Sequence, residues 1–517
     1  MRAFPLSFLL FLGVVAALSE EKDIVIPKNI VQSYIKKNAN FSVDPCDDFY
    51  AHVCPASSNG VFLHDLSSLK RDIVEKYRSR HPEENFFDSE VTTQNVAVVV
   101  ELVKTGQIVN LCVDPNYEVF MTQFARQFLT ITRENAEDLA TFNEWSCEEK
   151  ARFLQSVNET TFEGTYRNAR MMLSFGMDAL IMNTHLTQLD VKIRQLFEKI
   201  RVAIIKAISK TPWAKKNGSM NKFRAAVNKI TFTTFADLRN ATENVLVYYS
   251  NSMRNCHQQL DEIFDAHQGN AICDVIASGR SFRMLQQPTE HIRLGDLISV
   301  LSDTTQAFNS LDDHVYIGND MMLLMSTDHA ADLYGTIGFS MAHEIMHTIV
   351  FDERDKTYGN SLEPFWTKSA KCVAEQSLKT CQTFPTMPCD NQQTTFEEDA
   401  ADMASYRIAY GMYQKSYRRK ELVANYESIN KQQLFFYGAA AVFCNPVSMS
   451  PQPYASGMDH SNAYQRVNSL MSQMDQFASA FHCKPSDKMV MNKAKHCELY
   501  GKNAPETKRK NSEHGFY

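Results

Sequence analysis

The sequence predicts a mainly α-helical protein with more than one folding unit. Apolar residues recur at helical spacing over long stretches, as in Val191 to Ile208, where one side is apolar and the other carries Arg and Lys. Strand-like runs are short; His314 to Ile317 is one, and we expect it to be the edge strand along which an extended peptide could lie. A chain of 517 residues exceeds the size at which one core stays efficient, so two units are expected.

The segment His343-Glu344-Ile345-Met346-His347 carries the strongest chemical signal. On a helix, histidines four residues apart place both imidazoles on one face, where they can bind one metal ion, and their nitrogens suit Zn²⁺. Glu344 follows the first histidine and is placed to take a proton from a metal-bound water. The alternative is an ordinary amphipathic helix with two surface histidines.

The surrounding sequence favours a metal site. An apolar stripe beside the histidines predicts one helix from Leu333 to Val350, and it consists of Ile337, Met341, Ile345 and Ile349. A catalytic zinc site of this kind takes its third ligand from a second helix. In the acidic run 396–404, Glu398 and Asp402 share a helix face, so one can bind metal while the other accepts a hydrogen bond from a ligand imidazole. By itself, this run can also be the solvated start of a helix.

Together the two motifs resemble those of the neprilysin and endothelin-converting-enzyme family of zinc metallopeptidases, whose second motif reads E-N-x-A-D. Here that motif is Glu398-Asp399-Ala400-Ala401-Asp402. Three further segments are similar to family signatures and follow in the family's order: Pro45-Cys46-Asp47-Asp48-Phe49-Tyr50 with Cys54, Phe435-Phe436-Tyr437-Gly438 with Cys444, and His460 to Arg466 followed by Val467-Asn468 and Phe481-His482-Cys483.

The resemblance implies a thermolysin-like zinc-peptidase catalytic domain with a small edge sheet and a helical second domain. It makes His343, His347 and Glu398 the ligands of one Zn²⁺ per chain. Glu344 becomes the general base, and Asp402 becomes the group that orients a ligand histidine. A carboxylate in that last position fixes the ring orientation of the ligand and raises its basicity.

The resemblance also implies residues that contact the substrate. His460 matches the family histidine that stabilises the oxyanion, and Arg466 matches the arginine that grips a substrate carbonyl. Both roles make physical sense, because a donor aimed at developing negative charge is a large catalytic term and a guanidinium fork fixes a carbonyl. Asn309 and Ser310 lie where the family has an N-A pair that contacts substrate backbone, although a plain loop asparagine explains Asn309 as well.

Two of the chain's departures from the family bear directly on its activity. The family continues H-G-F-D from its second histidine, whereas this chain has Val350 where the aspartate is expected, and losing such a partner costs about 10–100-fold in metal affinity or activity. Asp352 can substitute if the helix ends there. The family's long helical insertion, which forms a lid, is also shortened to residues 113–146, so we expect a reduced second domain.

Twelve cysteines in an exported chain predict six disulfides, and the count by itself leaves on the order of ten thousand pairings. The family resemblance implies four pairs and leaves two further pairs that are close in sequence. The four implied pairs are Cys46 with Cys483, Cys54 with Cys444, Cys112 with Cys147, and Cys372 with Cys497. The remaining two are Cys256 with Cys273 and Cys381 with Cys389.

The N-terminus predicts export. Residues 1–19 combine Arg2, an apolar run and a small-x-small cleavage site, as in a secretory signal peptide, whereas a signal anchor needs a longer span. Surface glycosylation of an exported chain is expected at four sequons, at Asn40, Asn158, Asn217 and Asn240. The expected organisation is then residues 20–290 as an α-rich region with a truncated lid, 291–500 as the catalytic region and 501–517 as a mobile basic tail.

These patterns predict a secreted zinc metalloendopeptidase that hydrolyses peptides or flexible protein segments through a zinc-bound water. The alternative is a catalytically weak or inactive secreted binding protein that retains the peptidase scaffold. A net charge of −7 without a basic stripe excludes a nucleic-acid partner, whose phosphates require clustered Lys and Arg. No membrane span is expected in the mature chain, and the substrate sequence and oligomeric state do not follow from the sequence.

Overall fold

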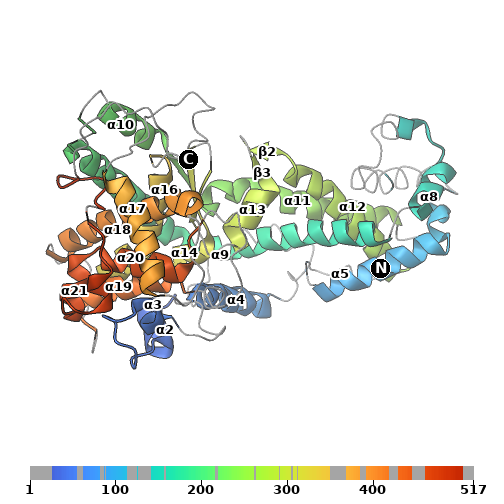
Figure 1. The fold of residues 1–517 in the computed structure, drawn as a ribbon. Helices are drawn as coiled ribbons and strands as arrows, with labels where there is room; N and C mark the ends of the chain where they lie inside the picture. The colour runs from blue at the N-terminus through green and yellow to red at the C-terminus, as the bar shows by residue number, and fades with distance from the viewer. Residues whose placement is uncertain are drawn as a thin grey trace. The chain divides into compact units, whose positions relative to one another are not determined.

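Helices dominate the computed structural model of the chain, as the sequence predicts (Figure 1). The structure describes residues 26–54, 62–81, 87, 89–112, 125, 141–156, 159–212, 214–215, 219–260, 264–289, 292–303, 307–310, 313–349, 368–384, 392–418, 429–444, 460–495 and 497–504. Several predicted features lie outside these residues: the signal peptide, Asn158, Asn217, Val350, Asp352, Cys389 and most of the C-terminal tail.

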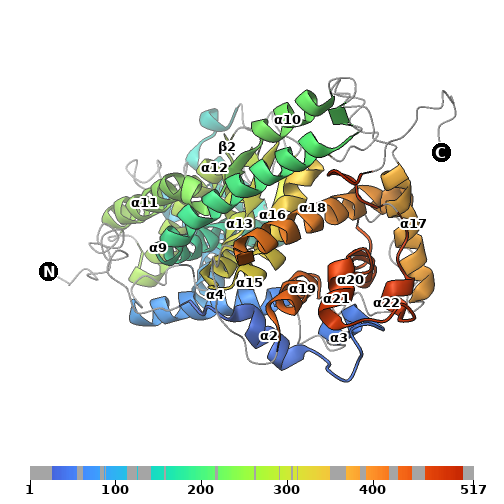
Figure 2. The same ribbon diagram turned by 90° about the vertical axis from the view of Figure 1, so that its left-hand side faces the viewer.

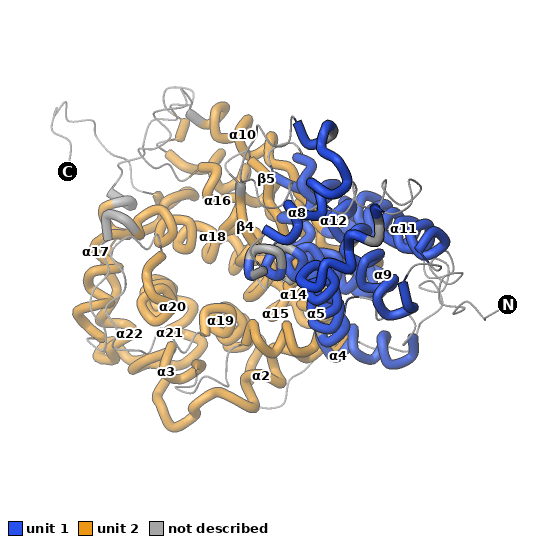
Figure 3. The backbone as a smooth tube through the Cα atoms, turned by 90° about the vertical axis from the view of Figure 1, so that its right-hand side faces the viewer, with its two compact units in different colours: residues 1–24, 70–185, 235–304 blue, residues 25–69, 186–234, 305–517 orange. Residues whose placement is uncertain are grey.

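The chain divides into two compact units that interleave along the sequence (Figure 3). Unit 1 contains residues 1–24, 70–185 and 235–304, and unit 2 contains 25–69, 186–234 and 305–517. The units therefore do not follow the linear division at residue 291. Two long helices, α4 (Phe62–Arg80) and α9 (Glu159–Lys210), contribute residues to both.

Unit 1 is helical, and besides its parts of α4 and α9 it contains α5 (Ser89–Lys104), η3 (Gln107–Cys112), η4 (Phe142–Glu144), α8 (Cys147–Ser156), α11 (Phe235–Leu260), α12 (Ala266–Leu285), β2 (Pro288–Thr289), β3 (Ile292–Arg293) and α13 (Leu294–Asp303). A buried ion pair between Arg170 and Asp274 lies in its core, where the hydroxyls of Tyr166 and Tyr249 also donate to the Asp274 carboxylate. Unit 1, the helical unit that contains the span between Cys112 and Cys147, is therefore built from residues on both sides of that span.

Unit 2 contains a three-stranded sheet and the helices of both metal-binding motifs. Its elements are α2 (Ile30–Asn38), α3 (Phe49–Val53), α10 (Ser219–Lys229), β1 (Thr231–Thr233), β4 (Ala307–Ser310), β5 (His314–Ile317), α14 (Asn319–Met322), η6 (Leu323–Ser326), α15 (Ala330–Gly335), α16 (Ile337–His347), α17 (Lys368–Thr383), α18 (Gln392–Arg418), α19 (Lys431–Ala441), α20 (Ala463–Ser472), α21 (Asp475–Phe481) and α22 (Lys488–Met491). Figure 2 shows α16 beside α18, and these two helices pack directly against each other.

The sheet corrects one prediction. Its strand order is β1-β5-β4, with β1 parallel and β4 antiparallel to β5. Among the described strands, the segment His314–Ile317 is therefore central, and β4, which carries Asn309 opposite Val315, lies at an edge. The alternation of residue types within a short strand marks its two faces but not its neighbours, so the sequence could not assign the edge.

The predicted helix from Leu333 to Val350 is in fact two helices. Thr336 separates α15 from α16 with φ −102° and ψ −98°, and α16 ends at His347. The chain is closely packed at this break, because a Cβ on Gly335 would lie 2.5 Å from the backbone carbonyl oxygen of Phe435 in α19. The apolar stripe is buried as predicted, and Ile337, Met341 and Ile345 are fully enclosed.

The apolar face predicted along α9 is buried with one exception. Residues from Ile193 to Ile208 on that face are at most 3% exposed, whereas Val191 is 57% exposed. Val191 therefore lies outside the buried stripe that the periodicity predicts.

Five predicted disulfides are present. In unit 2, Cys46–Cys483 and Cys54–Cys444 join the N-terminal segment to the C-terminal helices, and Cys372–Cys497 joins α17 to the last described segment. In unit 1 the pairs are Cys112–Cys147 and Cys256–Cys273. The sixth predicted pair includes Cys389, which lies outside the described residues.

Candidate metal centre

Two helices of unit 2 bring the three predicted zinc ligands together. His343 and His347 lie one turn apart on α16, and their Nε2 atoms are 2.9 Å apart. From α18, Glu398 Oε2 lies 3.1 Å from His343 Nε2, and Glu398 Oε1 lies 3.4 Å from His347 Nε2. All three side chains are at least partly buried.

This donor set fits a zinc ion. With bonds of about 2.0–2.1 Å, two ligand atoms on a tetrahedral zinc lie about 3.3–3.4 Å apart. The two imidazole nitrogens are 2.9 Å apart, and a different Glu398 oxygen approaches each of them, Oε2 at 3.1 Å from His343 and Oε1 at 3.4 Å from His347. These separations are within about half an ångström of that edge. Two imidazole nitrogens and one carboxylate are the protein donors of one type of catalytic zinc site, in which a water takes the fourth position.

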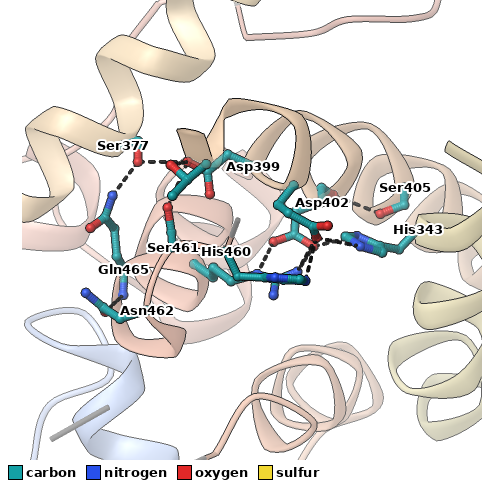
Figure 4. Close-up of polar contacts among 12 residues, drawn as sticks. His343, Ser377, Asp399, Asp402, Ser405, His460, Ser461, Asn462 and Gln465 are labelled. Carbon is teal, nitrogen blue, oxygen red and sulfur yellow. Dashed lines mark hydrogen bonds and ion pairs between the residues drawn. The ribbon is translucent and has the colours of Figure 1, made fainter. Parts of the chain in front are cut away.

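Asp402 supports one of the two histidines. Its Oδ1 atom lies 2.8 Å from His343 Nδ1, the nitrogen that faces away from Glu398 (Figure 4). The same carboxylate binds Arg466 through two contacts, 2.6 Å to Nε and 2.8 Å to Nη2. The predicted pairing of a carboxylate with a ligand imidazole is thus present in the geometry, and it involves His343.

His347 differs from His343 in this respect. Within the part of the chain that the structure describes, no carboxylate contact reaches the Nδ1 atom of His347, whereas Asp402 Oδ1 lies 2.8 Å from Nδ1 of His343. The sequence predicts this asymmetry, because Val350 stands where the family has an aspartate. A ligand imidazole without such a partner is less firmly oriented and less basic.

Glu344 is buried beside the ligands, at 8% exposure. The edge strand β4 holds the helix that carries it, because Asn309 Nδ2 donates to the backbone carbonyl of Glu344 at 2.6 Å and lies 3.2 Å from Thr348 Oγ1. The amide nitrogen of Asn309, predicted to contact substrate, therefore binds α16 in this structure. Ser310 lies next to it in β4, with its side chain outside the described residues.

The two other predicted substrate residues approach the centre from the C-terminal segment. His460 Nε2 lies 3.0 Å from Glu398 Oε2, and the His460 side chain is 51% exposed. Arg466 lies on α20, ion-paired with Asp402 and 3.6 Å from Glu398 Oε2. The guanidinium, predicted to grip a substrate carbonyl, is thus already engaged with the carboxylates of α18.

The electrostatics of the cluster favour a cation. Burial opposes a charge on His343, but the carboxylates of Asp402 and Glu398 outweigh it and raise the pKa of the imidazole to about 10. Burial and the neighbouring His343 lower the pKa of His347 to about 4. Glu398 keeps its charge despite burial, because hydrogen bonds from His343 and His460 hold its pKa well below the usual range. Burial raises the pKa of Glu344 to about 7.

One polar residue at the site was not singled out from the sequence. Asp399 follows the predicted ligand Glu398 and points away from the centre, where its Oδ2 atom accepts hydrogen bonds from Ser377, Thr395 and Ser461 (Figure 4). The available signal was that this chain has aspartate where the family motif has asparagine.

Fold and site together define the class as a mainly helical protein with the ligand set of a zinc metallopeptidase. Residues 324–497, which include all three ligands, match the model of Peptidase family M13. This match confirms the resemblance to the neprilysin and endothelin-converting-enzyme family that the motifs predict. The curated proteins similar to this chain include neprilysins and an endothelin-converting enzyme.

Three curated relatives illustrate the similarity. The chain is 30% identical to Neprilysin-3 of Drosophila melanogaster over 182 residues, covering 32% of this chain and 22% of the relative. It is 30% identical to Neprilysin-1 of Caenorhabditis elegans over 183 residues, covering 32% and 24%. Human Endothelin-converting enzyme 1 is 27% identical over 183 residues, covering 32% and 22%. The alignments therefore span less than a quarter of each relative's length.

Two solved structures align over most of the chain. The Mycobacterium tuberculosis zinc metalloprotease ZMP1 in complex with inhibitor is 14% identical, with a TM-score of 0.48, and the alignment covers 91% of this chain and all of that one. A chain of the Haemonchus galactose containing glycoprotein complex is also 14% identical, with a TM-score of 0.48, and the alignment covers 89% and 96%.

Proposed function

We propose that this protein is a zinc-dependent endopeptidase that hydrolyses peptides or flexible protein segments. The observation that carries the proposal is the convergence of three side chains: the Nε2 atoms of His343 and His347 lie 2.9 Å apart, and each lies within 3.4 Å of one of the two Glu398 carboxylate oxygens. The buried Glu344 follows the first ligand in the chain. These three side chains would hold the zinc. Bound there, zinc supplies Lewis-acid chemistry that polarises a scissile carbonyl and an attacking water.

The chain's own residues have distinct roles in this proposal. The Glu344 carboxylate accepts a proton from the attacking water and delivers it to the leaving amine nitrogen. The Nε2–H of His460 donates to the oxygen on which negative charge develops, which is a large catalytic term when the donor is held in place. Asp402 keeps the Nδ1 proton of His343 in place, so that Nε2 would be free to donate its lone pair to zinc.

The test is cleavage of a mixed peptide pool by the purified protein, with new termini identified by mass spectrometry. We expect cleavage that a chelator abolishes and added zinc restores, and about one zinc per chain by elemental analysis. The matched control is Glu344→Gln, which should keep the zinc and lower turnover by at least about 100-fold. Cleavage that survives the chelator, or equal activity in both proteins, would refute the proposal.

A second candidate is a binding protein that keeps the zinc and the scaffold but has little or no turnover. Val350, which stands where the family has an aspartate, favours it. Under this alternative, wild type and Glu344→Gln bind the same peptides and neither cleaves them. Val350→Asp separates the two candidates further, because restored turnover would identify a weakened peptidase.

We also propose that the protein acts outside the cell on peptide or polypeptide substrates. Disulfides persist in oxidising compartments, and five are present here. Two of the sequons, at Asn40 and Asn240, are exposed. Among the described helices, none is both long and apolar enough to cross a membrane. Recovery of glycosylated protein from the medium of expressing cells is the test, and retention in the cytosol would contradict it.

A further inference from the structure

We propose that Asp399 is a positioning residue that holds His460 over the metal centre through Ser461. The proposal rests on the proposed function, in which His460 donates to the developing oxyanion. Its basis is a set of hydrogen bonds that connects the segment carrying His460 to the side of α18 that faces away from the metal ligands.

The Asp399 carboxylate joins three parts of unit 2. Its Oδ2 atom accepts from Ser377 on α17 at 2.9 Å, from Thr395 on its own helix at 3.3 Å and from Ser461 at 3.0 Å. Asp399 is 9% exposed and Ser461 is 2% exposed, so water competes little for these bonds. A buried carboxylate is costly unless it is hydrogen-bonded, so the three hydroxyls and the carboxylate hold one another in a defined arrangement.

Ser461 transmits this constraint to His460, its neighbour in the chain. The His460 side chain is 51% exposed, so packing alone does not hold it, whereas the adjacent Ser461 is anchored in the interior. Consecutive Cα atoms are about 3.8 Å apart, so anchoring Ser461 keeps the His460 Cα within that distance of a fixed point. His460 Nε2 then lies 3.0 Å from the carboxylate of the ligand Glu398.

A second set of contacts anchors the same segment one turn later. Asn462 caps α20 by accepting a hydrogen bond from the backbone N–H of Gln465. The Gln465 side chain donates to Ser377 Oγ, which in turn donates to Asp399. The start of α20 is thus held at Ser461 and at Gln465, and both contacts lead to Asp399 (Figure 4).

The geometry distinguishes Asp399 from its neighbours in the motif. Glu398 and Asp402 face the metal centre, whereas Asp399 faces the opposite wall, formed by α17 and the segment before α20. An acceptor oxygen is what the three hydroxyls require. Asparagine, which the family has at this position, retains one such oxygen, and alanine retains none.

The primary test is backbone hydrogen exchange at residues 460–462, measured by mass spectrometry on the zinc-loaded full chain. We expect Asp399→Ala and Ser461→Ala to speed exchange at these residues at least about 10-fold, and Asp399→Asn to stay near wild type. Thr395→Val is the matched control, because it removes one hydrogen bond from Asp399 without touching Ser461. Unchanged exchange in both alanine variants would overturn the proposal, and the Ser461 variant decides the matter if Asp399→Ala fails to fold.

Kinetics provide the second test. Asp399→Ala and Ser461→Ala should lower kcat by about 10–100-fold, as expected for loss of an outer partner, with little change in KM or zinc content. In the His460→Ala background neither change should lower kcat further, because the effect passes through His460. Additive losses would overturn the proposal. If the wild-type protein cleaves no peptide, the proposed endopeptidase activity is refuted. The hydrogen-exchange experiment then still tests whether Asp399 positions His460.

Discussion

Asp402 is the residue whose removal should reveal most about the metal centre. Its buried carboxylate serves two partners at once, His343 Nδ1 at 2.8 Å and the Arg466 guanidinium at 2.6 and 2.8 Å. We expect Asp402→Ala to weaken zinc binding and to destabilise unit 2, by two separable mechanisms.

The expected loss of zinc affinity follows from the contact between Asp402 and His343. Loss of a carboxylate that orients a ligand imidazole costs about 10–100-fold in metal affinity, which corresponds to about 1.4–2.8 kcal/mol. The expected loss of stability follows from Arg466, because its side chain is only 12% exposed and would lose its bidentate partner. Breaking a buried ion pair from one side costs about 3–5 kcal/mol, and Glu398 at 3.6 Å compensates only in part.

Zinc affinity is measured by competition with a chromophoric chelator, and stability by urea denaturation of the zinc-free proteins. The double variant Asp402→Ala with Arg466→Met separates the two losses. It removes the unpaired guanidinium, so stability should recover in part, but zinc affinity should stay low because His343 Nδ1 still has no acceptor. The reasoning is refuted if zinc affinity in Asp402→Ala stays within about 3-fold of wild type, or if the double variant restores it.

Three further outcomes are expected. Burial raises the pKa of Asp332 from 3.8 to about 8, so the folded protein retains a proton that the unfolded chain loses, and stability falls as pH rises between these values. The urea midpoint of Asp332→Asn should therefore improve relative to wild type as pH rises across this window, and a pH-independent difference would contradict it. Gly335→Ala should lower the free energy of unfolding by about 1–3 kcal/mol, because its Cβ would lie 2.5 Å from a carbonyl oxygen of α19. Gly411→Ala is the control, since its Cβ meets open space, and it should raise the free energy of unfolding by up to about 1 kcal/mol. Equal melting temperatures for the two variants would argue against the clash. Arg170→Leu leaves the buried Asp274 without its charged partner and should destabilise unit 1 by about 3–5 kcal/mol in chemical denaturation, and a loss below about 1 kcal/mol would show that the pair is dispensable.

Most of the metal centre could be predicted because its spacing is a local property of helices. Histidines at i and i+4 share a face whatever surrounds the helix, and the same holds for Glu398 and Asp402. The convergence of the two helices was not visible in local spacing, and it came from the resemblance to a known family. Four of the five described disulfides were predicted in the same way, since cysteine spacing alone allows many pairings, and Cys256–Cys273 was predicted because those two cysteines were left over and close in sequence.

What the sequence determined by itself is therefore the helical character of the chain, the faces of its helices and the donor atoms of the site. Only the tertiary structure decided that the metal-binding helix begins after a break at Thr336, that β5 is central and β4 an edge, and that Arg466 pairs with Asp402. The reason is physical. Periodicity records interactions between residues a few positions apart, whereas the strand order and the Arg466–Asp402 pair depend on atoms brought together from distant parts of the chain.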